Sequence, residues 1–558
     1  MNGMIELHGA KLVFADGNTY IPINSTSLLP GDHVTIDSDG RCTLTYRPEQ
    51  VAIGVIRHIY NGVATLWIAT VAAACPFQPT VFAEPSYKIG DRLVIWLKSD
   101  GNILVKTRFS ASPRDDARCI LDAYCTVKER HTTAEYYDGH HYTRDDIVDH
   151  SDLDTFTIDP ESSIDFDDAI SIDGESGNIY IHIVDIAGND AANVITEQSA
   201  KRLRERCFSL YLANEYTEHL LDGEDTVRTL SLVVGQQRHV VTVRVTLLYG
   251  EVISYDIYRS TIIVKKRWNY EQVAAALADG SAPPAIRLLA DLHEMRSADV
   301  QYSIKMPSVR LKISPYGLPL DARLEATNDV AHGLVATVMI LANLVVSKHL
   351  RNKGIVLPNR FHDHLRGIKW IDFPSTGDDS ADSFILLKRY ARANYAIDQR
   401  GHFGLGLMDY VHFTSPMRRY ADVLVHKLLA GWKVSNHVLE QEVAWLNSRA
   451  YLCRVLQDLY ESWKVGHWLK SVKVLEPVYI TDVKKVGIMW FMPSLLLNGF
   501  THVANIHPNQ FWTFDAAEQS LSGPKAAASI QVGSKMTPIM DRIDPITGAI
   551  HLILSLNH

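Results

Sequence analysis

The 558-residue sequence has few cysteines, no excess of basic residues and no segment typical of a secretory signal. Its six cysteines form no CxxC pair and no cluster with histidine at zinc-site spacing, so we expect free thiols in a reducing compartment. The N-terminus lacks a basic start followed by an apolar core. The most apolar stretch, Leu334–Val346, is too short to span a bilayer, and its apolar residues recur at helical spacing. These absences predict a cytoplasmic protein with no membrane contact.

The charge balance is mildly acidic, with a net charge of −9. Residues 1–110 carry nine basic and nine acidic side chains, and residues 474–558 carry five and six, so the remaining −8 lies between them. Acidity argues against a partner rich in phosphates, because non-specific nucleic-acid binding usually needs a basic face. The hydrophobic fraction, 46%, is ordinary for globular proteins and excludes collagen-like and disordered chains.

The order of patterns along the chain predicts a multidomain α+β protein. Residues 1–48 and 49–111 alternate apolar and polar residues around turns at Asp16-Gly17, Asn61-Gly62 and Asp100-Gly101, which favours small β barrels of the OB type, although other small barrels fit nearly as well. Residues 112–472 mix strand-like stretches (180–187 and 240–249) with helical ones (331–348, 420–432 and 439–469). Residues 473–558 return to short strands, so we expect one more OB barrel there.

A cluster of acids in residues 155–173, TFTIDPESSIDFDDAISID, is the densest chemistry in the sequence. Asp159 follows a strand-like segment, and Asp165, Asp167 and Asp168 come from a short loop before strand character resumes. Four carboxylates this close repel one another unless a cation neutralises them, and all-oxygen ligands suit Mg²⁺ or Mn²⁺. The alternative is a solvated acidic turn. The apolar residues between the acids indicate a partly buried loop instead.

A second block spans residues 402–429, HFGLGLMDYVHFTSPMRRYADVLVHKLL. Ser415-Pro416 predicts a helix start, which places Arg418 and Arg419 in the first turn, where the helix dipole disfavours cations. This unfavourable placement suggests a bound anion such as phosphate. The alternative is that Arg418 pairs with Asp422 one turn later.

Together the two blocks resemble the signature motifs of the RNB family of exoribonucleases, the ribonuclease II and ribonuclease R type. The resemblance covers nearly the whole chain. It implies a large mixed α+β RNB catalytic domain (112–472), flanked by two cold-shock-like OB modules (1–48 and 49–111) and an S1-type OB domain (473–558). It also implies hydrolysis of single-stranded RNA from the 3′ end to nucleoside 5′-monophosphates, with Mg²⁺ or Mn²⁺ as the metal ion. No feature of the sequence indicates an oligomer, so we expect a monomer.

The resemblance also assigns roles to individual residues. Asp159 and Asp168 would hold a first metal ion, and Asp165 and Asp167 would complete the coordination of a second. Arg418, with Arg419 beside it, would contact the RNA phosphate. Tyr211 would pack against the terminal nucleotide, and Tyr270 would help to read its ribose.

Several positions depart from the family pattern. Ala336-Thr337 replaces a Glu-Glu pair that cooperates with the Tyr270-type aromatic at the ribose, Val309 and Leu311 stand where a second stacking aromatic is expected, and Glu461 is only a candidate for a late glutamate. Two alternatives therefore remain beside an RNA-specific nuclease. One is a non-hydrolytic RNA-binding protein on an RNB scaffold, and the other is an exonuclease with relaxed sugar specificity that also accepts DNA.

Overall fold

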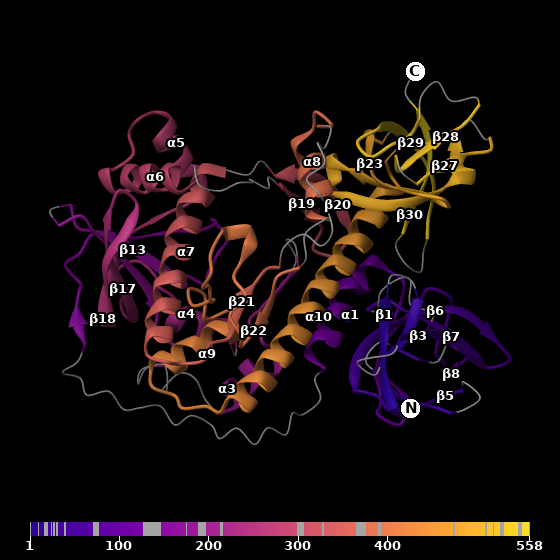
Figure 1. The fold of residues 1–558 in the computed structure, drawn as a ribbon, viewed down its shortest axis with the longest axis horizontal. Helices are drawn as coiled ribbons and strands as arrows, with labels where there is room; N and C mark the ends of the chain where they lie inside the picture. Colours follow the sequence, from indigo (N-terminus) through magenta and orange to yellow (C-terminus); the bar gives the residue numbers. More distant parts are fainter. Residues whose placement is uncertain are drawn as a thin grey trace.

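The computed structural model places two small β regions and a third, C-terminal one on one side of a large α/β body (Figure 1). The structure describes the chain except for residues 1, 9–10, 16–19, 24, 26–27, 30–31, 38–40, 71–76, 127–146, 175, 188–196, 213–215, 222, 298–305, 326–328, 364–374, 389–391, 473–474, 508–509, 517, 525–528, 545–548 and 557–558. The predicted turn at Asp16-Gly17 and the thiol of Cys75 lie outside the described residues.

The first two β regions are five-stranded antiparallel sheets. The first contains β1 (Asn2–His8), β2 (Lys11–Ala15), β3 (Tyr20–Ile23), β4 (His33–Ile36) and β5 (Cys42–Tyr46). The second contains β6 (Gln50–Tyr60), β7 (Val63–Ile68), β8 (Thr80–Phe82), β9 (Arg92–Leu97) and β10 (Ile103–Phe109). In both sheets the strand order, counted within the region, is 3-2-1-4-5. This is the order of a five-stranded Greek-key OB fold.

The C-terminal region repeats the same order. Its main strands are β23 (Val478–Lys484), β24 (Gly487–Met492), β25 (Leu497–His502), β29 (Lys535–Ile543) and β30 (Ile550–Leu556). They lie in the order β25-β24-β23-β29-β30, and β25 packs back against β30, which closes the barrel. Shorter pieces complete the region: β26 (Ile506–His507), β27 (Thr513–Asp515), β28 (Ser520–Ser522), η4 (Pro493–Leu495) and η5 (Val503–Asn505).

Two of the predicted hairpin turns are present. Asn61 (φ 48°) and Gly62 (φ 73°) connect β6 to β7, and two consecutive left-handed residues are what the type I′ turn of a tight hairpin requires. Gly101 (φ 85°) follows Asp100 between β9 and β10, and the Asp100 carboxylate accepts the backbone N–H of Asn102 at 2.9 Å.

A six-stranded sheet forms the centre of the α/β body, in the order β11-β18-β12-β13-β14-β17. Its strands are β11 (Val148–Asp149), β12 (Thr155–Ile158), β13 (Asp168–Ile172), β14 (Asn178–Val184), β17 (Gln237–Leu248) and β18 (Glu251–Trp268). The long strand β18 pairs with β17 in its first part and runs parallel to β12 at its end, so the sheet closes on itself. The short hairpins are β15 (Leu210–Leu212) with β16 (Tyr216–Glu218), β19 (Ser308–Ile313) with β20 (Pro319–Glu325), and β21 (Asn359–Phe361) with β22 (Asn394–Ala396).

Helices cover the central sheet from two sides. One buried core joins the sheet to α5 (Tyr270–Ala278), α6 (Pro284–Ser297) and α7 (Asp329–Asn352). The other joins it to α3 (Glu197–Arg206), α4 (Gly223–Leu230), α9 (Tyr420–Leu429) and α10 (Asn436–Leu469). The remaining helices are α1 (Asp116–Cys125), α8 (Asp379–Leu387), η1 (Pro113–Asp115) and η3 (Phe403–Leu405).

Helix α7 is longer than the apolar stretch in the sequence indicated. Among the described helices, its residues Val330–Asn352 are long and apolar enough to cross a membrane by length and composition, with 56% of the most apolar window buried in the protein. Leu334, Val338 and Leu341 are fully buried in the core against the central sheet. This burial is typical of a core helix.

The hydrophobic cores cross the predicted domain boundaries. The second β region shares a core with α1, with β15 and with the middle of α10, where Cys453 and Trp463 are buried. The C-terminal barrel shares its core with the end of α10 and with the β19–β20 hairpin, which contributes Leu311. The helix α10 therefore connects both sets of β regions to the α/β body, as Figure 1 shows. The division at residues 48, 111 and 472 stays a prediction.

Candidate active site

The four aspartates of the acidic motif lie at one end of β12 and β13. Asp159 follows the last residue of β12, and Asp168 is the first residue of β13. The two strands are antiparallel, with Phe156 opposite Ile170, so the chain brings Asp159 back towards Asp168 through the loop that carries Asp165 and Asp167. The sequence predicted this strand–loop–strand arrangement, and the structure has it.

The electrostatics of this cluster are those of buried, mutually repelling acids. Burial, followed by repulsion from Asp168, raises the pKa of Asp159 to about 8. Burial also raises the pKa of Asp168 to about 6, against the opposing effect of Arg418. Asp167 is only 3% exposed, and burial raises its pKa well above the usual range. All three carboxylates are therefore costly to ionise in the absence of a cation.

Two carboxylate oxygens of the cluster are not satisfied by hydrogen bonds from residues that the structure describes. Asp159 Oδ2 and Asp167 Oδ2 are buried and accept no hydrogen bond from the described residues. Unsatisfied buried carboxylate oxygens beside a repelling neighbour fit a site that takes a hard cation. Within the described part of the chain, however, no group of three or more His, Cys, Asp or Glu side chains is arranged to hold a metal ion. The donor set fits a cation, while the positions of the four carboxylates do not form a closed coordination sphere.

These pKa values predict a stability that depends on pH and on Mg²⁺. The folded-state pKa of Asp159 (about 8) and of Asp168 (about 6) lie above the ordinary aspartate value, so ionisation disfavours the metal-free fold. With a chelator present, we expect the melting temperature to fall as the pH rises from 6 through 8. Mg²⁺ should raise it more at pH 8.5 than at pH 6, with proton release on binding at the lower pH. The same scans of Asp168→Asn should show a weaker pH dependence, because Asp159 then loses the neighbour that repels it.

Residues of the turn that precedes α9 contact the loop that carries the aspartates. The backbone N–H of Met417 donates to Asp167 Oδ1 at 2.8 Å, and Arg418 Nε lies 3.7 Å from Asp167 Oδ2. Arg418 also donates to Ser415 Oγ at 2.9 Å. The Arg418 side chain is 44% exposed, so its guanidinium lies between the buried Asp167 carboxylate and the solvent.

The predicted start of this helix was wrong. Helix α9 begins at Tyr420, and Arg419 has an extended backbone (φ −137°, ψ 122°). The reason is backbone pairing with another segment. Ser209 N–H donates to Arg418 carbonyl oxygen at 3.0 Å, and Tyr420 N–H donates to the Cys207 carbonyl at 2.7 Å. This pairing holds Arg419 in a strand-like conformation, so the helix cannot begin before the next residue.

The two arginines differ in their surroundings. Arg419, not Arg418, pairs with Asp422, at 2.7 Å, and the Asp422 carboxylate is fully buried. Burial lowers the pKa of the Arg419 guanidinium and the Asp422 carboxylate raises it, and the net effect is a raised pKa. The alternative pairing of Arg418 with Asp422 was therefore wrong. In this geometry the Arg419 guanidinium is engaged by Asp422 within the fold. A contact between Arg419 and RNA stays a prediction.

Both predicted tyrosines lie close to the aspartates. Tyr211, 37% exposed on β15, donates its hydroxyl to Asp165 Oδ2 at 2.8 Å. Tyr270, the first residue of α5, has a pKa raised by burial and then by Asp159 and Asp168. Its ring stacks on His332 of α7, with 3.7 Å between the ring centroids and 16° between the planes. His332 was not predicted from the sequence, because a single histidine at the start of an apolar helix does not indicate such a contact.

Three residues that depart from the family pattern, Thr337, Val309 and Leu311, contact neighbouring elements of the fold. Thr337 is 7% exposed and bonds to His293 Nδ1 at 2.9 Å, so this position faces α6. Val309 and Leu311 contribute to the core of the C-terminal barrel. Burial raises the pKa of Glu461, and the neighbouring acid that adds to the shift is Asp458, not one of the four aspartates.

Buried carboxylates lie beside a half-exposed arginine at one end of a closed sheet, and this combination of charges would suit a cation and a phosphate group. The RNB domain family profile matches residues 147–433, which is more than half of the chain. The chain therefore belongs to the RNB family.

Individual relatives agree with this assignment. The chain is 25% identical over 531 residues to ribonuclease R of Chlamydia trachomatis, covering 82% of this chain and 75% of the relative. Its fold matches Mycoplasma genitalium RNase R in complex with ribose methylated single-stranded RNA, with a TM-score of 0.77, 19% identity and coverage of 99% and 100% of the two chains. It also resembles yeast Ssd1, a pseudonuclease, with a TM-score of 0.68, 15% identity and coverage of 93% and 81%. The predicted family, the mixed fold class and the exoribonuclease class are confirmed.

Proposed function

We propose that this chain is a 3′-to-5′ exoribonuclease that hydrolyses single-stranded RNA to nucleoside 5′-monophosphates, as a monomer in the cytoplasm and with Mg²⁺ or Mn²⁺. The observation that carries the proposal is the cluster of buried aspartates with Arg418 beside it. A protein that only binds RNA has no use for acids that repel one another in its interior.

The chemistry is a hydrolysis of the last phosphodiester. Water adds to phosphorus, the bond from phosphorus to the 3′ oxygen breaks, and the shortened strand takes a proton as its new 3′ hydroxyl. Asp159 and Asp168 would hold a divalent cation, and Asp165 and Asp167 would support a second. Such ions, when bound, neutralise charge that develops on the attacking and leaving oxygens. Arg418, charged and half-exposed, contacts the phosphate and stabilises its developing charge.

The contacts of the tyrosines suit the end of a single strand. Tyr211 is exposed enough to stack on the terminal base, and it must release Asp165 when that carboxylate turns to a cation. Stacking accepts any base and is worth about 1–3 kcal/mol for each one. This would make the enzyme tolerant of sequence.

The proposal is tested with matched substrates. RNA and DNA of identical sequence, each with a single-stranded 3′ tail, are incubated with the protein in Mg²⁺ or in chelator, and the products are separated. We expect nucleoside 5′-monophosphates from RNA in Mg²⁺ only. Bound but intact RNA would favour the non-hydrolytic alternative, and equally fast loss of DNA would favour the enzyme with relaxed sugar specificity.

The Tyr270–His332 stack predicts a second result. His332 and Ala336 are one turn apart on the exposed side of α7. His332, and not the residue at position 336, is therefore the side chain of α7 that contacts the Tyr270 ring. Loss of an aromatic pair costs about 0.5–1.5 kcal/mol, so His332→Ala should lower kcat/KM on RNA by roughly 2- to 10-fold. We also expect His332→Ala to lower the ratio of the RNA hydrolysis rate to the DNA hydrolysis rate. His437→Ala, which changes a histidine at the start of α10, is the control, and an unchanged ratio in His332→Ala would exclude a role in reading the sugar.

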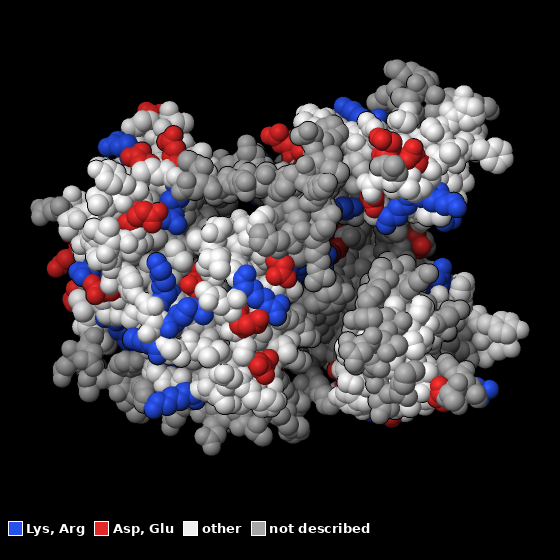
Figure 2. Space-filling view, viewed as in Figure 1, with Lys and Arg blue, Asp and Glu red and all other residues white. Residues whose placement is uncertain are grey.

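The charge distribution predicts a weak salt dependence. Basic and acidic side chains are mixed over the face shown in Figure 2, with basic groups gathered at the lower edge of the C-terminal region. Each phosphate contact contributes a slope of roughly −0.7 in a plot of log K against log salt, so we expect a slope shallower than about −3 for single-stranded RNA. A steeper slope, measured by fluorescence anisotropy on the full chain, would reveal a continuous basic channel.

A further inference from the structure

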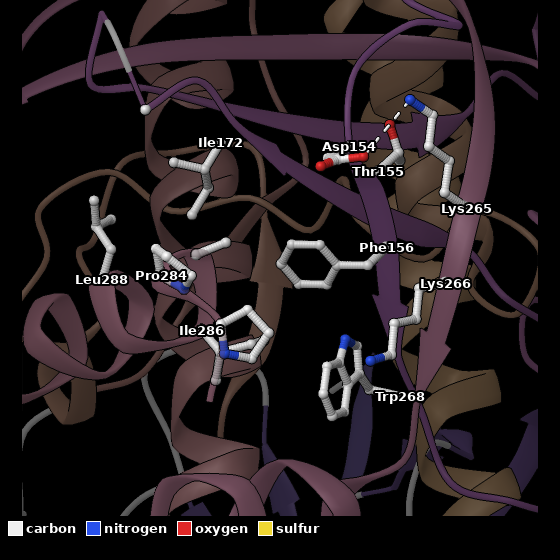
Figure 3. A pocket seen from close by; sticks show the side chains of 13 residues that line it. Asp154, Thr155, Phe156, Ile172, Lys265, Lys266, Trp268, Pro284, Ile286 and Leu288 are labelled. Atoms are coloured by element: carbon white, nitrogen blue, oxygen red, sulfur yellow. Dashed lines mark ion pairs between the residues drawn. The ribbon is translucent and has the colours of Figure 1, made fainter. Parts of the chain in front are cut away.

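A pocket of ≈ 410 Å³ lies at the end of β12 and β13 that is opposite to the aspartates (Figure 3). It is bounded by the start of β12, the end of β13, the end of β18 and the start of α6. Small-molecule sites usually enclose roughly 300–1,000 Å³, so this volume suits one small ligand. The cluster of aspartates does not line it.

The walls of the pocket are aromatic and apolar. Figure 3 shows Phe156 and Trp268 facing an open space, with Pro284 and Ile286 across from them. Trp268 is half-buried and Pro284 is exposed, and both line the pocket, so a flat ring can reach them from solvent. Flat rings gain most from such walls, because they stack on the indole and on the proline ring.

The rim of the pocket is basic because of a local irregularity in the sheet. Thr155 pairs with Val264 and Phe156 with Lys266, so Lys265 is an extra residue in β18, and both lysines line the pocket. A β-bulge re-aims side chains in this way. Lys265 Nζ donates to the Asp152 carbonyl oxygen at 2.6 Å and lies 3.6 Å from the exposed carboxylate of Asp154. Among the described residues, Lys266 has no carboxylate partner, and its ammonium lies 3.4 Å from the centroid of the Trp268 ring.

We propose that this pocket binds a nucleoside 5′-monophosphate, with the base against Trp268 and the phosphate at Lys265 and Lys266. An aromatic wall next to a lysine that has no carboxylate partner among the described residues selects a ligand that joins a flat ring to an anion, which would draw the Lys266 ammonium off the indole. The choice of this ligand rests on the proposed function, because that reaction releases nucleoside 5′-monophosphates at the other end of the same two strands.

The pocket is connected to the active site through the backbone of β18. The Trp268 carbonyl accepts the backbone N–H of Asp159 at 3.1 Å, and Tyr270 follows two residues later. A ligand that stacks on Trp268 therefore contacts the segment that positions both residues. The pocket would bind the product at one end of β12, while Asp159 follows the other end of the same strand.

The test titrates AMP, in chelator, into the full-length Asp167→Asn protein saturated with single-stranded RNA, so that the catalytic site is filled and the RNA is not hydrolysed during the titration. Isothermal titration calorimetry should show one equivalent of bound AMP. On the same background, Lys266→Ala should weaken binding about tenfold through the loss of a charge-assisted hydrogen bond. Leu288→Trp, a change of a residue at the pocket that is 37% exposed, should fill the space and abolish binding. Lys312→Ala, an exposed lysine on β19, is the matched control and should bind as the parent does.

Three results would overturn the proposal: no binding of AMP to the RNA-saturated protein, equal affinity for ribose 5-phosphate, or unchanged affinity in both pocket variants. Hydrolysis of RNA by the wild-type chain is measured separately. An inactive chain that binds AMP as described would reject the proposed function and keep the pocket. An active chain without this AMP site would reject the pocket alone.

Discussion

Replacing Asp167 with asparagine should lower the rate of RNA hydrolysis by about 10²- to 10³-fold while RNA binding remains. The asparagine keeps the shape of the side chain, and its Oδ1 atom can still accept the Met417 N–H that Asp167 accepts at 2.8 Å. What disappears is the carboxyl group that lies beside Arg418 and that would ionise to support a cation. Asp167→Asn should therefore fold as the wild type does and lose most of the hydrolytic activity.

The comparison needs two measurements and one control. Initial rates on single-stranded RNA in Mg²⁺ give the loss of activity, and anisotropy with the same RNA in chelator gives the affinity. Asp152→Asn changes an exposed acid seven residues before Asp159 and should behave as the wild type does. A rate for Asp167→Asn within twofold of the wild type would remove this carboxylate from the catalytic set.

Replacing Asp116 with alanine should destabilise the attachment of the second β region by about 3–5 kcal/mol. Asp116 is fully buried at the start of α1. It accepts a hydrogen bond from Arg92 of β9, and its Oδ2 atom lies 3.7 Å from Nζ of Lys464, a fully buried residue of α10. The alanine would leave two cations in the interior without their common carboxylate.

Trp463 offers a probe of this junction, because the Arg92 guanidinium lies 3.6 Å from its ring centroid. Urea unfolding followed by tryptophan fluorescence should show the midpoint move to lower urea in Asp116→Ala. The double change Asp116→Ala with Lys464→Met should recover part of the loss, since it removes one of the two buried charges. Arg118→Ala, at a side chain that is 74% exposed, should leave the midpoint unchanged. An unchanged midpoint in Asp116→Ala would show that the junction does not depend on this carboxylate.

Local sequence signals predicted the elements of the fold well. The Asn61-Gly62 hairpin needs two residues with positive φ, and few residue types adopt them. The helical spacing of Leu334, Val338 and Leu341 reflects one buried face of α7. Non-local contacts were harder to predict. The start of α9 depends on backbone pairing with residues 207–209, which are about two hundred residues away.

The candidate site shows the same division. The spacing of Asp159, Asp165, Asp167 and Asp168 is local, and the structure places them together. The stacking of His332 on Tyr270 joins two helices, and no pattern within either one encodes it. The bulge at Lys265 likewise appears only when β18 pairs with β12.

The most direct measurement follows 5′-labelled single-stranded RNA over time with the wild-type chain in Mg²⁺. We expect a ladder that shortens from the 3′ end, with nucleoside 5′-monophosphates as the small products and no reaction in chelator. RNA that is bound but stays intact would contradict an exoribonuclease function, and so would fragments from internal cuts.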